Sequence, residues 1–206
     1  NCIDLTEATK FNRNIDRKEI LDILYLGRIE PNKGIDYILD ACKILKKEGV
    51  KFHLHFAGKE ETEGQYIPEF KEALGDNFTY HGIVSGAPKT ELLKKCDIFL
   101  LPSFYEGLPM SLLETMSFGQ VPIVTPVGSI PMVITDKVNG IFIRLKNTED
   151  IVNAVTELKK TAAIINAGKT FNVVRDGKDT AEVAQLINYF YEDAATTAIY
   201  TINPDS

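Results

Sequence analysis

The sequence lacks the residues that would support a disulfide scaffold, a zinc site or a membrane span. It has three cysteines, Cys2, Cys42 and Cys96, an odd number without the close spacing of disulfide frameworks or zinc sites. No apolar run approaches the ~20 residues that a transmembrane helix needs. Basic clusters are missing too, and 29 acidic against 23 basic residues give a net charge of −6. We therefore expect reduced thiols in a cytoplasmic protein with no transmembrane segment and no nucleic-acid partner.

Motifs that bind metals or dinucleotides are also missing. The chain contains no Asp-x-Asp pair, no Walker A loop and no G-x-G-x-x-G turn, so neither a metal nor a nicotinamide cofactor is indicated. His53 and His55 share one side of an expected strand, but no cysteine or acidic cluster accompanies them as further metal ligands. His81 is better placed to touch a ligand, because it lies at a strand end. We expect that no metal is required.

The sequence does contain a regular alternation of apolar strands and amphipathic helices. Its 206 residues, 44% of them hydrophobic, are enough to bury one large core. Short apolar runs predict strands at residues 22–27, 52–58, 78–82, 98–103, 121–125 and 139–145. Helical periodicity predicts helices at residues 35–47, 66–74, 88–96, 109–118 and 147–160. This order predicts an α/β fold, a Rossmann-like parallel sheet of about six strands with helices on both faces.

The segments outside this alternation divide the chain into three expected parts. Residues 1–19 are polar and aperiodic, which is typical of a linker or entry segment. Residues 20–193 form the expected domain, and its last helix is predicted at 179–193, where apolar residues share one side. Residues 194–206 are expected to form a loosely ordered tail.

Two cations follow the first expected strand, at the edge where a parallel sheet binds its ligands. Arg28 comes directly after Gly27, and Lys33 comes five residues later, just before the next helix. A glycine turn, the free N–H groups of a helix start and two cationic side chains all favour an anion such as a pyrophosphate. From these residues alone, the alternative of two solvated surface charges stays open.

Two glutamates occupy the turn and the helix that follow the fourth expected strand. Glu106 precedes a Gly-Leu-Pro turn, Pro109 suits the first turn of the helix, and Glu114 lies one turn further along. A carboxylate accepts two hydroxyl hydrogen bonds, as the diol of a ribose or a pyranose offers. The alternative is that Glu106 caps free N–H groups and Glu114 is a solvated charge. Spacing alone favours that alternative.

Five segments between about residues 20 and 160 favour ligand binding over solvated charges for these residues: GRIEPNKG, FHLHFAG, YHGIV, CDIFLLPSFYEGLPMSLLETMSFGQVPIVT and GSIPMVITDKVNGIFI. Together they resemble the C-terminal, donor-binding domain of the retaining glycosyltransferases of family 4, which have the two-domain GT-B fold. The two glutamates separated by seven residues are the most specific part of the resemblance. The first residues, NCIDLTEATKF, are similar to the linker between the two domains of that family.

The resemblance implies roles for the four charged residues. Arg28 and Lys33 match the cations that neutralise the donor pyrophosphate, and Glu106 matches the acid near the donor sugar. These three are the expected catalytic residues. Glu114 matches the acid that binds the ribose hydroxyls.

The resemblance also assigns the uncharged part of the donor site. Gly27 is expected beside the phosphates, and backbone groups of three residues after the fourth strand are expected to line the sugar and phosphates: Gly107, Leu108 and Met110. Ile83 and Val84 match the strand-end residues that flank the nucleobase. The expected ligand is a UDP- or GDP-linked sugar.

The resemblance further implies a partner and a process. The chain is expected to be the donor half of a hexosyltransferase in cell-envelope polysaccharide synthesis, at the inner face of the membrane in the full-length protein. It is expected to be inactive by itself because the N-terminal acceptor domain is missing. An apolar stripe at 179–193 without its partner domain predicts some self-association.

Two other functions stay open at this point. One is the matching half of a GT-B nucleotide-sugar epimerase or phosphorylase, against which the combination of the cation pair and the spaced glutamates argues. The other is a non-catalytic, flavodoxin-like binding module, which would have no need for the paired glutamates.

Overall fold

The computed structural model describes residues 7–8, 11, 19–62 and 64–160, and the description below concerns these residues. They form one six-stranded sheet in the order β3-β2-β1-β4-β5-β6, and every neighbouring pair of strands is parallel. The strands are β1 Leu21–Leu26, β2 Phe52–Ala57, β3 Phe78–Tyr80, β4 Ile98–Leu101, β5 Val121–Val124 and β6 Ile141–Phe142. This order is that of a Rossmann-like sheet, which confirms the predicted fold class.

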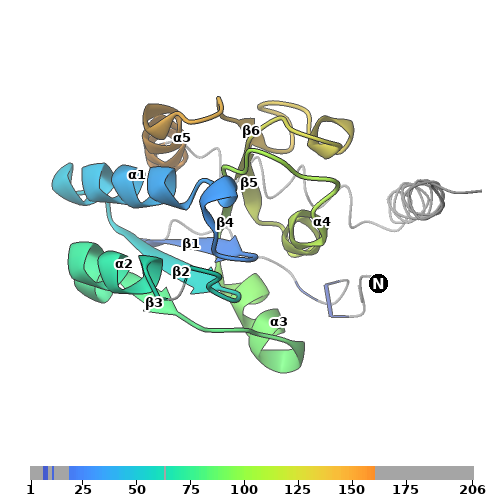
Figure 1. Ribbon diagram of the computed structural model, residues 1–206. Coiled ribbons are helices and arrows are strands. Elements are labelled where there is room, and N and C mark those ends of the chain that lie inside the picture. The colour runs from blue at the N-terminus through green and yellow to red at the C-terminus, as the bar shows by residue number, and fades with distance from the viewer. Residues whose placement is uncertain (1–6, 9–10, 12–18, 63, 161–206) are drawn as a thin grey trace, which may run out of the picture. The chain divides into compact units, whose positions relative to one another are not determined.

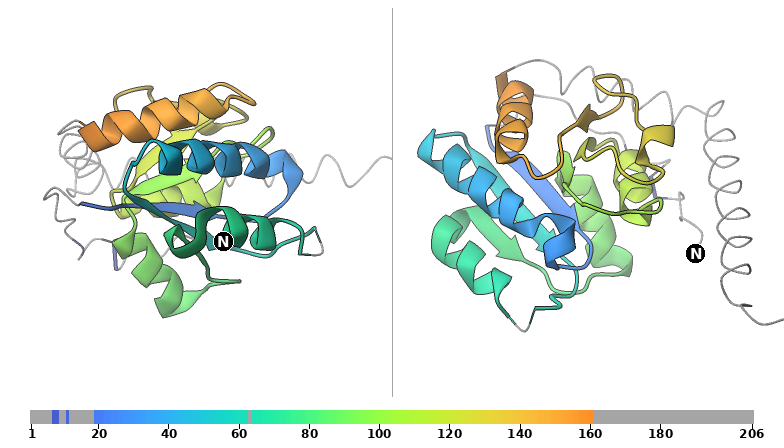
Figure 2. Two further views of the ribbon diagram at one scale, coloured as in Figure 1. Left: turned by 90° about the vertical axis from the view of Figure 1, so that its left-hand side faces the viewer. Right: turned by 45° about the horizontal axis from the view of Figure 1, so that its top comes forward.

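Five α-helices cover both faces of the sheet (Figures 1 and 2). They are α1 Ile35–Lys47, α2 Tyr66–Leu74, α3 Gly86–Lys95, α4 Met110–Ser117 and α5 Thr148–Lys160. Right-handed crossovers place α1 and α2 on one face and α3 and α4 on the other, because the chain reverses direction across the sheet after β3. α5 returns to pack beside α1. Short 3₁₀ helices follow three elements: Pro31–Lys33, Gly75–Asn77 and Ile130–Met132.

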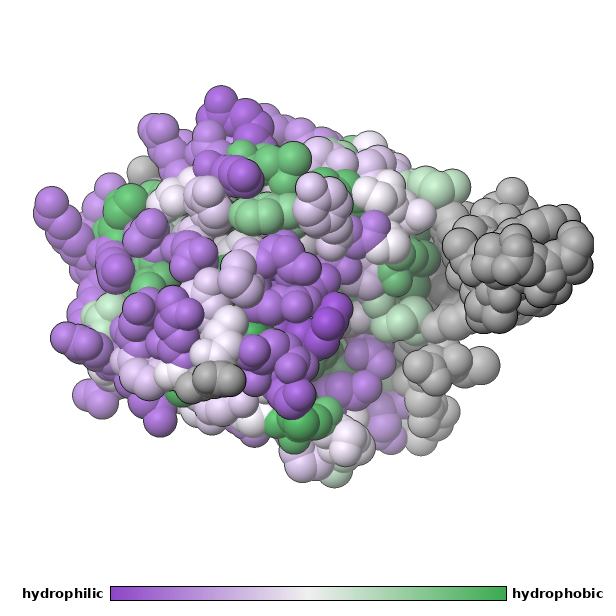
Figure 3. All heavy atoms as spheres, viewed as in Figure 1, coloured by the Kyte–Doolittle hydropathy of each residue, from purple (hydrophilic) through white to green (hydrophobic). Residues whose placement is uncertain are grey.

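The core is built from near-continuous apolar strands, as a sheet covered on both faces requires. All four residues of β4 and all four of β5 are buried. Aromatic rings from three elements pack on the α1/α2 face, where the ring of Phe56 lies 4.8 Å from Tyr25 and 4.6 Å from Phe70 between centroids. The apolar face of α1 predicted from its periodicity is buried against this cluster. On the face seen in Figure 3, hydrophilic side chains surround small, separate apolar areas.

The bounds of the elements differ from the prediction mainly at glycine and proline. α1 and α2 begin and end where predicted, and Asn147 caps α5 by accepting a hydrogen bond from the Asp150 N–H at 2.9 Å. α3 begins at Gly86, two residues before Pro88. The first turn of a helix tolerates a proline, because its missing N–H would have no partner within the helix there. Pro109 precedes α4 instead of opening it, with an extended backbone. β6 has two residues where seven were predicted.

Several predictions lie outside the described residues. They concern Cys2, most of the segment 1–19, the helix at 179–193 with its apolar stripe, and the tail 194–206. The proposed division of the chain at residues 19 and 193 therefore stays a prediction. Within the described part of the chain, none of the helices combines the length and the apolar composition that crossing a bilayer requires.

Candidate functional site

The sheet order places the site between the loops that follow β1 and β4. These two strands are neighbours, yet β1 connects onward to β2 on one side and β4 connects to β5 on the other. Ligands of open parallel sheets bind at such a reversal point, beyond the carboxyl ends of the strands. The loop 27–34 and the loop 102–109 are therefore the segments that can hold a ligand.

Backbone contacts fix these two loops to one another. The Phe104 N–H donates to the Asn32 carbonyl at 2.8 Å. Gly34 has φ +71°, and a Cβ at this position would lie 2.3 Å from the carbonyl oxygen of Pro102. Only a glycine permits both the left-handed backbone and this approach. The chain before α1 is therefore held against the chain after β4.

The loop after β5 closes on the same place. The Ser129 N–H donates to the Gly107 carbonyl at 3.0 Å. A Cβ at Gly128 would lie 1.9 Å from the Glu106 carbonyl oxygen, so this glycine lets the two backbones touch. On the other side, the Gly27 N–H donates to Ala57 at 3.0 Å. The carboxyl edge is thus a continuous set of loops whose backbones support one another.

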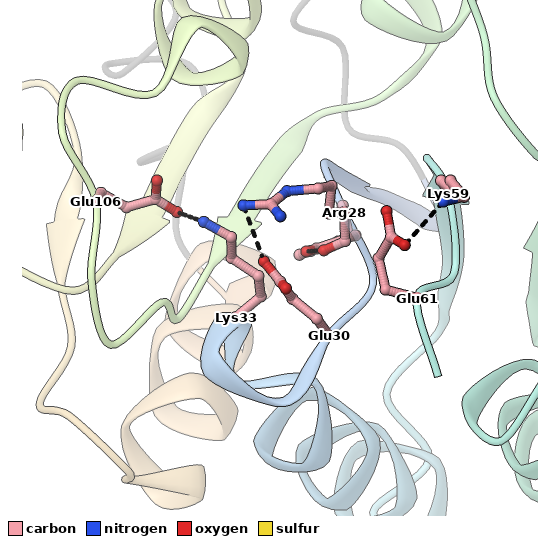
Figure 4. A network of polar contacts seen from close by, with 7 residues as sticks. Arg28, Glu30, Lys33, Lys59, Glu61 and Glu106 are labelled. Carbon is pink, nitrogen blue, oxygen red and sulfur yellow. Dashed lines mark hydrogen bonds and ion pairs between the residues drawn. The ribbon is translucent and has the colours of Figure 1, made fainter. Parts of the chain in front are cut away.

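Lys33 and Glu106 meet within this set of loops. The Lys33 ammonium donates a hydrogen bond to Glu106 Oε1 at 2.8 Å, although the two residues are 73 positions apart in the sequence. Their side chains are only 13% and 10% exposed. Figure 4 shows the two side chains pointing toward one another from the β1 and β4 loops. Lys33, expected to bind phosphate, and Glu106, expected to bind the donor sugar, are therefore in direct contact.

Arg28 lies beside this pair and is open to solvent. Its guanidinium is 3.2 Å from Glu30, and its side chain is 63% exposed, so it can turn toward a ligand (Figure 4). Below it, the buried Tyr25 hydroxyl donates to the Arg28 carbonyl. Burial, and then the negative charges of Glu106 and Glu30, raise the pKa of Tyr25 above its usual range. The hydroxyl therefore stays protonated and keeps the backbone of the β1 loop in place.

Glu114 has a different partner. Its Oε1 accepts a hydrogen bond at 2.8 Å from the ammonium of Lys89, on α3, and both side chains are partly buried. No described contact joins Glu114 to the group formed by Arg28, Lys33 and Glu106. The alternative of a solvated charge is nevertheless not what the structure shows, because Glu114 is held between two helices.

The uncharged residues expected at the site lie on the same edge with different exposures. Ile83 is an exposed apolar residue after β3, with 75% of its surface accessible, and Val84 packs partly against the core below α3. Gly107 is exposed, and Leu108 and Met110 are half-buried. An exposed isoleucine at a strand end is consistent with a surface that a flat ring could cover.

The sequence alone did not reveal Glu30, Lys89 or Tyr25 as neighbours of the site. Glu30 was visible only as one more acid between two cations. Lys89 belongs to α3, and its distance from Glu114 depends on how α3 packs beside α4. Tyr25 was indistinguishable from any other apolar strand residue.

A chain of histidines lies elsewhere, on the face of the sheet that α3 covers. His55 Nε2 lies 3.0 Å from Asp22 Oδ1, and His55 Nδ1 lies 3.0 Å from His81 Nε2. His53 stacks on His55 with 4.5 Å between ring centroids and bonds to Thr79 at 2.8 Å. Since the carboxylate can only accept, His55 donates to Asp22 through Nε2. Among residues 7–8, 11, 19–62 and 64–160, no group of three or more His, Cys, Asp or Glu side chains is arranged to hold a metal.

This histidine chain predicts a stability loss in mild acid. Burial, followed by the neighbouring His55 and Lys95, lowers the pKa of both His53 and His81. The unfolded chain, with histidine pKa values of about 6.5, therefore takes up protons that the folded chain does not. The contribution of these histidines to the free energy of unfolding should be fully present above about pH 6.5. It should be lost as the pH falls through the lowered folded-state pKa values of His53 and His81. Urea unfolding at about pH 7 and about pH 5.5 measures this difference.

Variants separate the histidines from other acid-sensitive groups. His53→Gln and His81→Gln should each flatten the dependence in this window. Asp150→Asn should leave it unchanged, because the pKa of Asp150 is lowered by its Arg144 hydrogen bond and Asp150 titrates in the carboxylate range. An unchanged slope in both histidine variants would contradict the prediction.

Known proteins match both the sequence and the fold. The sequence model of the family Glycosyl transferases group 1 matches residues 6–171. An uncharacterized glycosyltransferase of Methanocaldococcus jannaschii is 33% identical over 149 residues, covering 70% of this chain and 37% of that protein. The N,N'-diacetylbacillosaminyl-diphospho-undecaprenol alpha-1,3-N-acetylgalactosaminyltransferase of Campylobacter jejuni is 29% identical, with coverage of 71% and 37%. The chain thus spans less than two fifths of the length of these relatives.

Two solved structures show the same fold at low identity. The C-terminal domain of a glycosyl transferase group 1 family protein from Francisella tularensis is 20% identical with a TM-score of 0.65, covering 76% of this chain and 85% of that one. Anabaena HepE in complex with UDP and glucose is 16% identical with a TM-score of 0.68, covering 92% and 53%. The order of strands and helices is therefore shared with these structures.

Proposed function

Because this chain belongs to the Glycosyl transferases group 1 family and has the fold of the C-terminal domain of a GT-B glycosyltransferase, we propose that it binds the nucleotide-diphospho-sugar donor of a retaining hexosyltransferase. The observation that carries the proposal is the convergence of Lys33 and Glu106 at 2.8 Å, with Arg28 beside them, where β1 and β4 diverge. An anion and a polyol are the ligands that such a group of cations and carboxylate recognises.

The cations serve the leaving group in this proposal. Cleavage of the bond between sugar and diphosphate places negative charge on the departing nucleoside diphosphate. The enclosed Lys33 and the more exposed Arg28 offset that charge, most strongly when it is largest. Gly27, at the start of the β1 loop, is expected to lie beside the phosphates.

The carboxylates serve the sugars. Glu106 is placed to accept hydrogen bonds from hydroxyls of the donor sugar, next to the backbone groups of Gly107, Leu108 and Met110. Glu114 uses Oε1 for Lys89, and its second oxygen can accept from a ribose diol. Ile83 and Val84 flank the base.

Relatives suggest the process in which the transfer takes place. The Campylobacter jejuni relative is named for a diphospho-undecaprenol-linked acceptor, and a relative from Erwinia amylovora is named for amylovoran biosynthesis. We propose transfer to a glycan in cell-envelope polysaccharide synthesis, at the cytoplasmic side of the membrane. HepE was solved with UDP, so UDP is the first nucleotide to test, with GDP as the second.

The 206-residue chain is expected to bind donor without transferring sugar. The acceptor is proposed to bind to the part of the relatives that this chain does not cover, and closure of two domains around the donor excludes water. An assay with purified chain, donor and a series of glycan acceptors should show no acceptor-dependent turnover. Such turnover would contradict this part of the proposal.

Calorimetric titration with UDP, GDP and ADP tests donor binding. One of the three should bind, and Glu114→Gln should weaken it at least about tenfold because a charged acceptor of ribose hydroxyls is removed. Glu91→Gln on the exposed side of α3 is the matched control and should bind like the unchanged chain. Binding of none of the three nucleotides would reject the proposed function, and equal effects of the two substitutions would reject the role of Glu114.

A further inference from the structure

The Lys33–Glu106 pair joins the two groups that the proposed function assigns to different parts of the ligand. The ammonium is meant for a phosphate and the carboxylate for a sugar, yet each holds the other at 2.8 Å. With side chains 13% and 10% exposed, the pair is shielded from the water and salt that make surface ion pairs weak. A diphosphate that uses Lys33 must first compete with Glu106.

Both partners are held by backbone that cannot easily move. Lys33 ends the 3₁₀ helix Pro31–Lys33, and the next residue, Gly34, is pressed against Pro102. The backbone of Glu106 is in contact with Gly128. The pair is therefore an arrangement imposed by the fold, whereas Arg28 has a largely exposed side chain that can adapt.

We propose that Glu106 is a specificity-determining residue that, through Lys33, favours sugar-linked over sugar-free nucleoside diphosphate; this inference rests on the proposed function. Both ligands displace Glu106 from Lys33. A sugar-linked ligand brings hydroxyls that can donate to the displaced carboxylate. A sugar-free nucleoside diphosphate brings no such hydroxyl to this position, so the displaced carboxylate continues to compete with the phosphate for Lys33.

The consequence concerns the order of binding and release. Before transfer, hydroxyls of the sugar donate hydrogen bonds to Glu106 in place of Lys33. After transfer, the remaining diphosphate faces an uncompensated carboxylate that competes for the same ammonium. Glu106 therefore disfavours the product at the position where the donor is favoured, without any movement of the backbone.

The test measures dissociation constants for a nucleoside diphosphate and its sugar-linked form, UDP and UDP-glucose or the GDP- or ADP-linked equivalents, whichever base binds. Glu106→Gln keeps the shape of the side chain and removes its charge. This substitution should lower the dissociation constant of the sugar-free nucleotide about tenfold and should not lower that of the sugar-linked nucleotide. Glu61→Gln removes a negative charge from the exposed Lys59–Glu61 pair on the neighbouring loop, seen in Figure 4, and should change neither constant by more than about twofold.

A double substitution distinguishes competition for Lys33 from simple repulsion of the phosphate. In a Lys33→Gln background, Glu106→Gln should bring no gain in affinity for the sugar-free nucleotide. A gain that persists there, or no gain in the single variant, would overturn the inference while leaving the proposed function intact. If no nucleotide binds to any variant whose thermal unfolding matches that of the unchanged chain, the proposed function fails and the inference fails with it. Should Glu106→Gln unfold early, Glu106→Ala in the same series supplies the comparison.

Discussion

Replacing Lys33 with glutamine is expected to weaken the binding of a nucleoside diphosphate by about a hundredfold, as the loss of a charge-assisted contact to phosphate from an enclosed cation implies. The substitution removes the enclosed ammonium, which lies 2.8 Å from Glu106 and is the proposed contact to the phosphate. Calorimetric titration with the nucleotide that binds best measures the change.

The matched control for this result is Lys59→Gln. Lys59 is a cation of the neighbouring loop with a side chain that is 62% exposed, and it pairs with Glu61 at 2.9 Å. Its removal lowers the net positive charge of the edge by the same amount but should cost no more than about twofold in affinity. Equal losses of affinity in the two variants would mean that only the overall electrostatic potential at this edge of the sheet matters. They would contradict a direct contact between Lys33 and the phosphate.

Replacing Gly34 with alanine is expected to destabilise the fold by about 3 kcal/mol, a large fraction of the stability of a domain this size. The added Cβ would lie 2.3 Å from the Pro102 carbonyl oxygen, a backbone atom that cannot turn aside. Because this contact joins the β1 and β4 loops, the change should also displace Lys33. The free energy of unfolding in urea is the measurement.

Gly49 provides a control with the same backbone conformation. Its φ is +73°, close to the +71° of Gly34, but nothing lies within 4 Å of its Cβ position. Gly49→Ala should therefore cost only the left-handed strain, about 1 kcal/mol. If both substitutions cost the same, the close approach at Gly34 contributes nothing, and the proposed rigidity of the Lys33 backbone would lose its support.

The sequence predicted the bounds of long, periodic helices better than the bounds of short strands. α1 matches its predicted bounds because five apolar residues repeat on one face over 13 positions. β1, β2 and β3 end before the glycine that closes each of their predicted runs. Gly27 and Gly58 follow β1 and β2. The Gly27 N–H donates to Ala57, the last residue of β2, and the Gly58 N–H donates to Gly82 in the loop after β3.

The site was predictable as a set of loops but not as a set of contacts. Arg28, Lys33 and Glu106 all follow strands, and the rule for parallel sheets places all of them at one edge. Their pairing depends on β1 lying next to β4, a property of strand order that a simple alternation of strands and helices leaves undetermined. The same holds for Glu114 with Lys89, which needs the packing of α3 beside α4.

The most direct test of the central claim is a crystal structure of the chain with its preferred nucleoside diphosphate bound. We predict that the diphosphate lies between Arg28 and Lys33, with Glu106 displaced from the Lys33 ammonium and the ribose hydroxyls within hydrogen-bonding distance of Glu114. A nucleotide bound away from the carboxyl ends of β1 and β4, with the Lys33–Glu106 pair intact, would contradict the account.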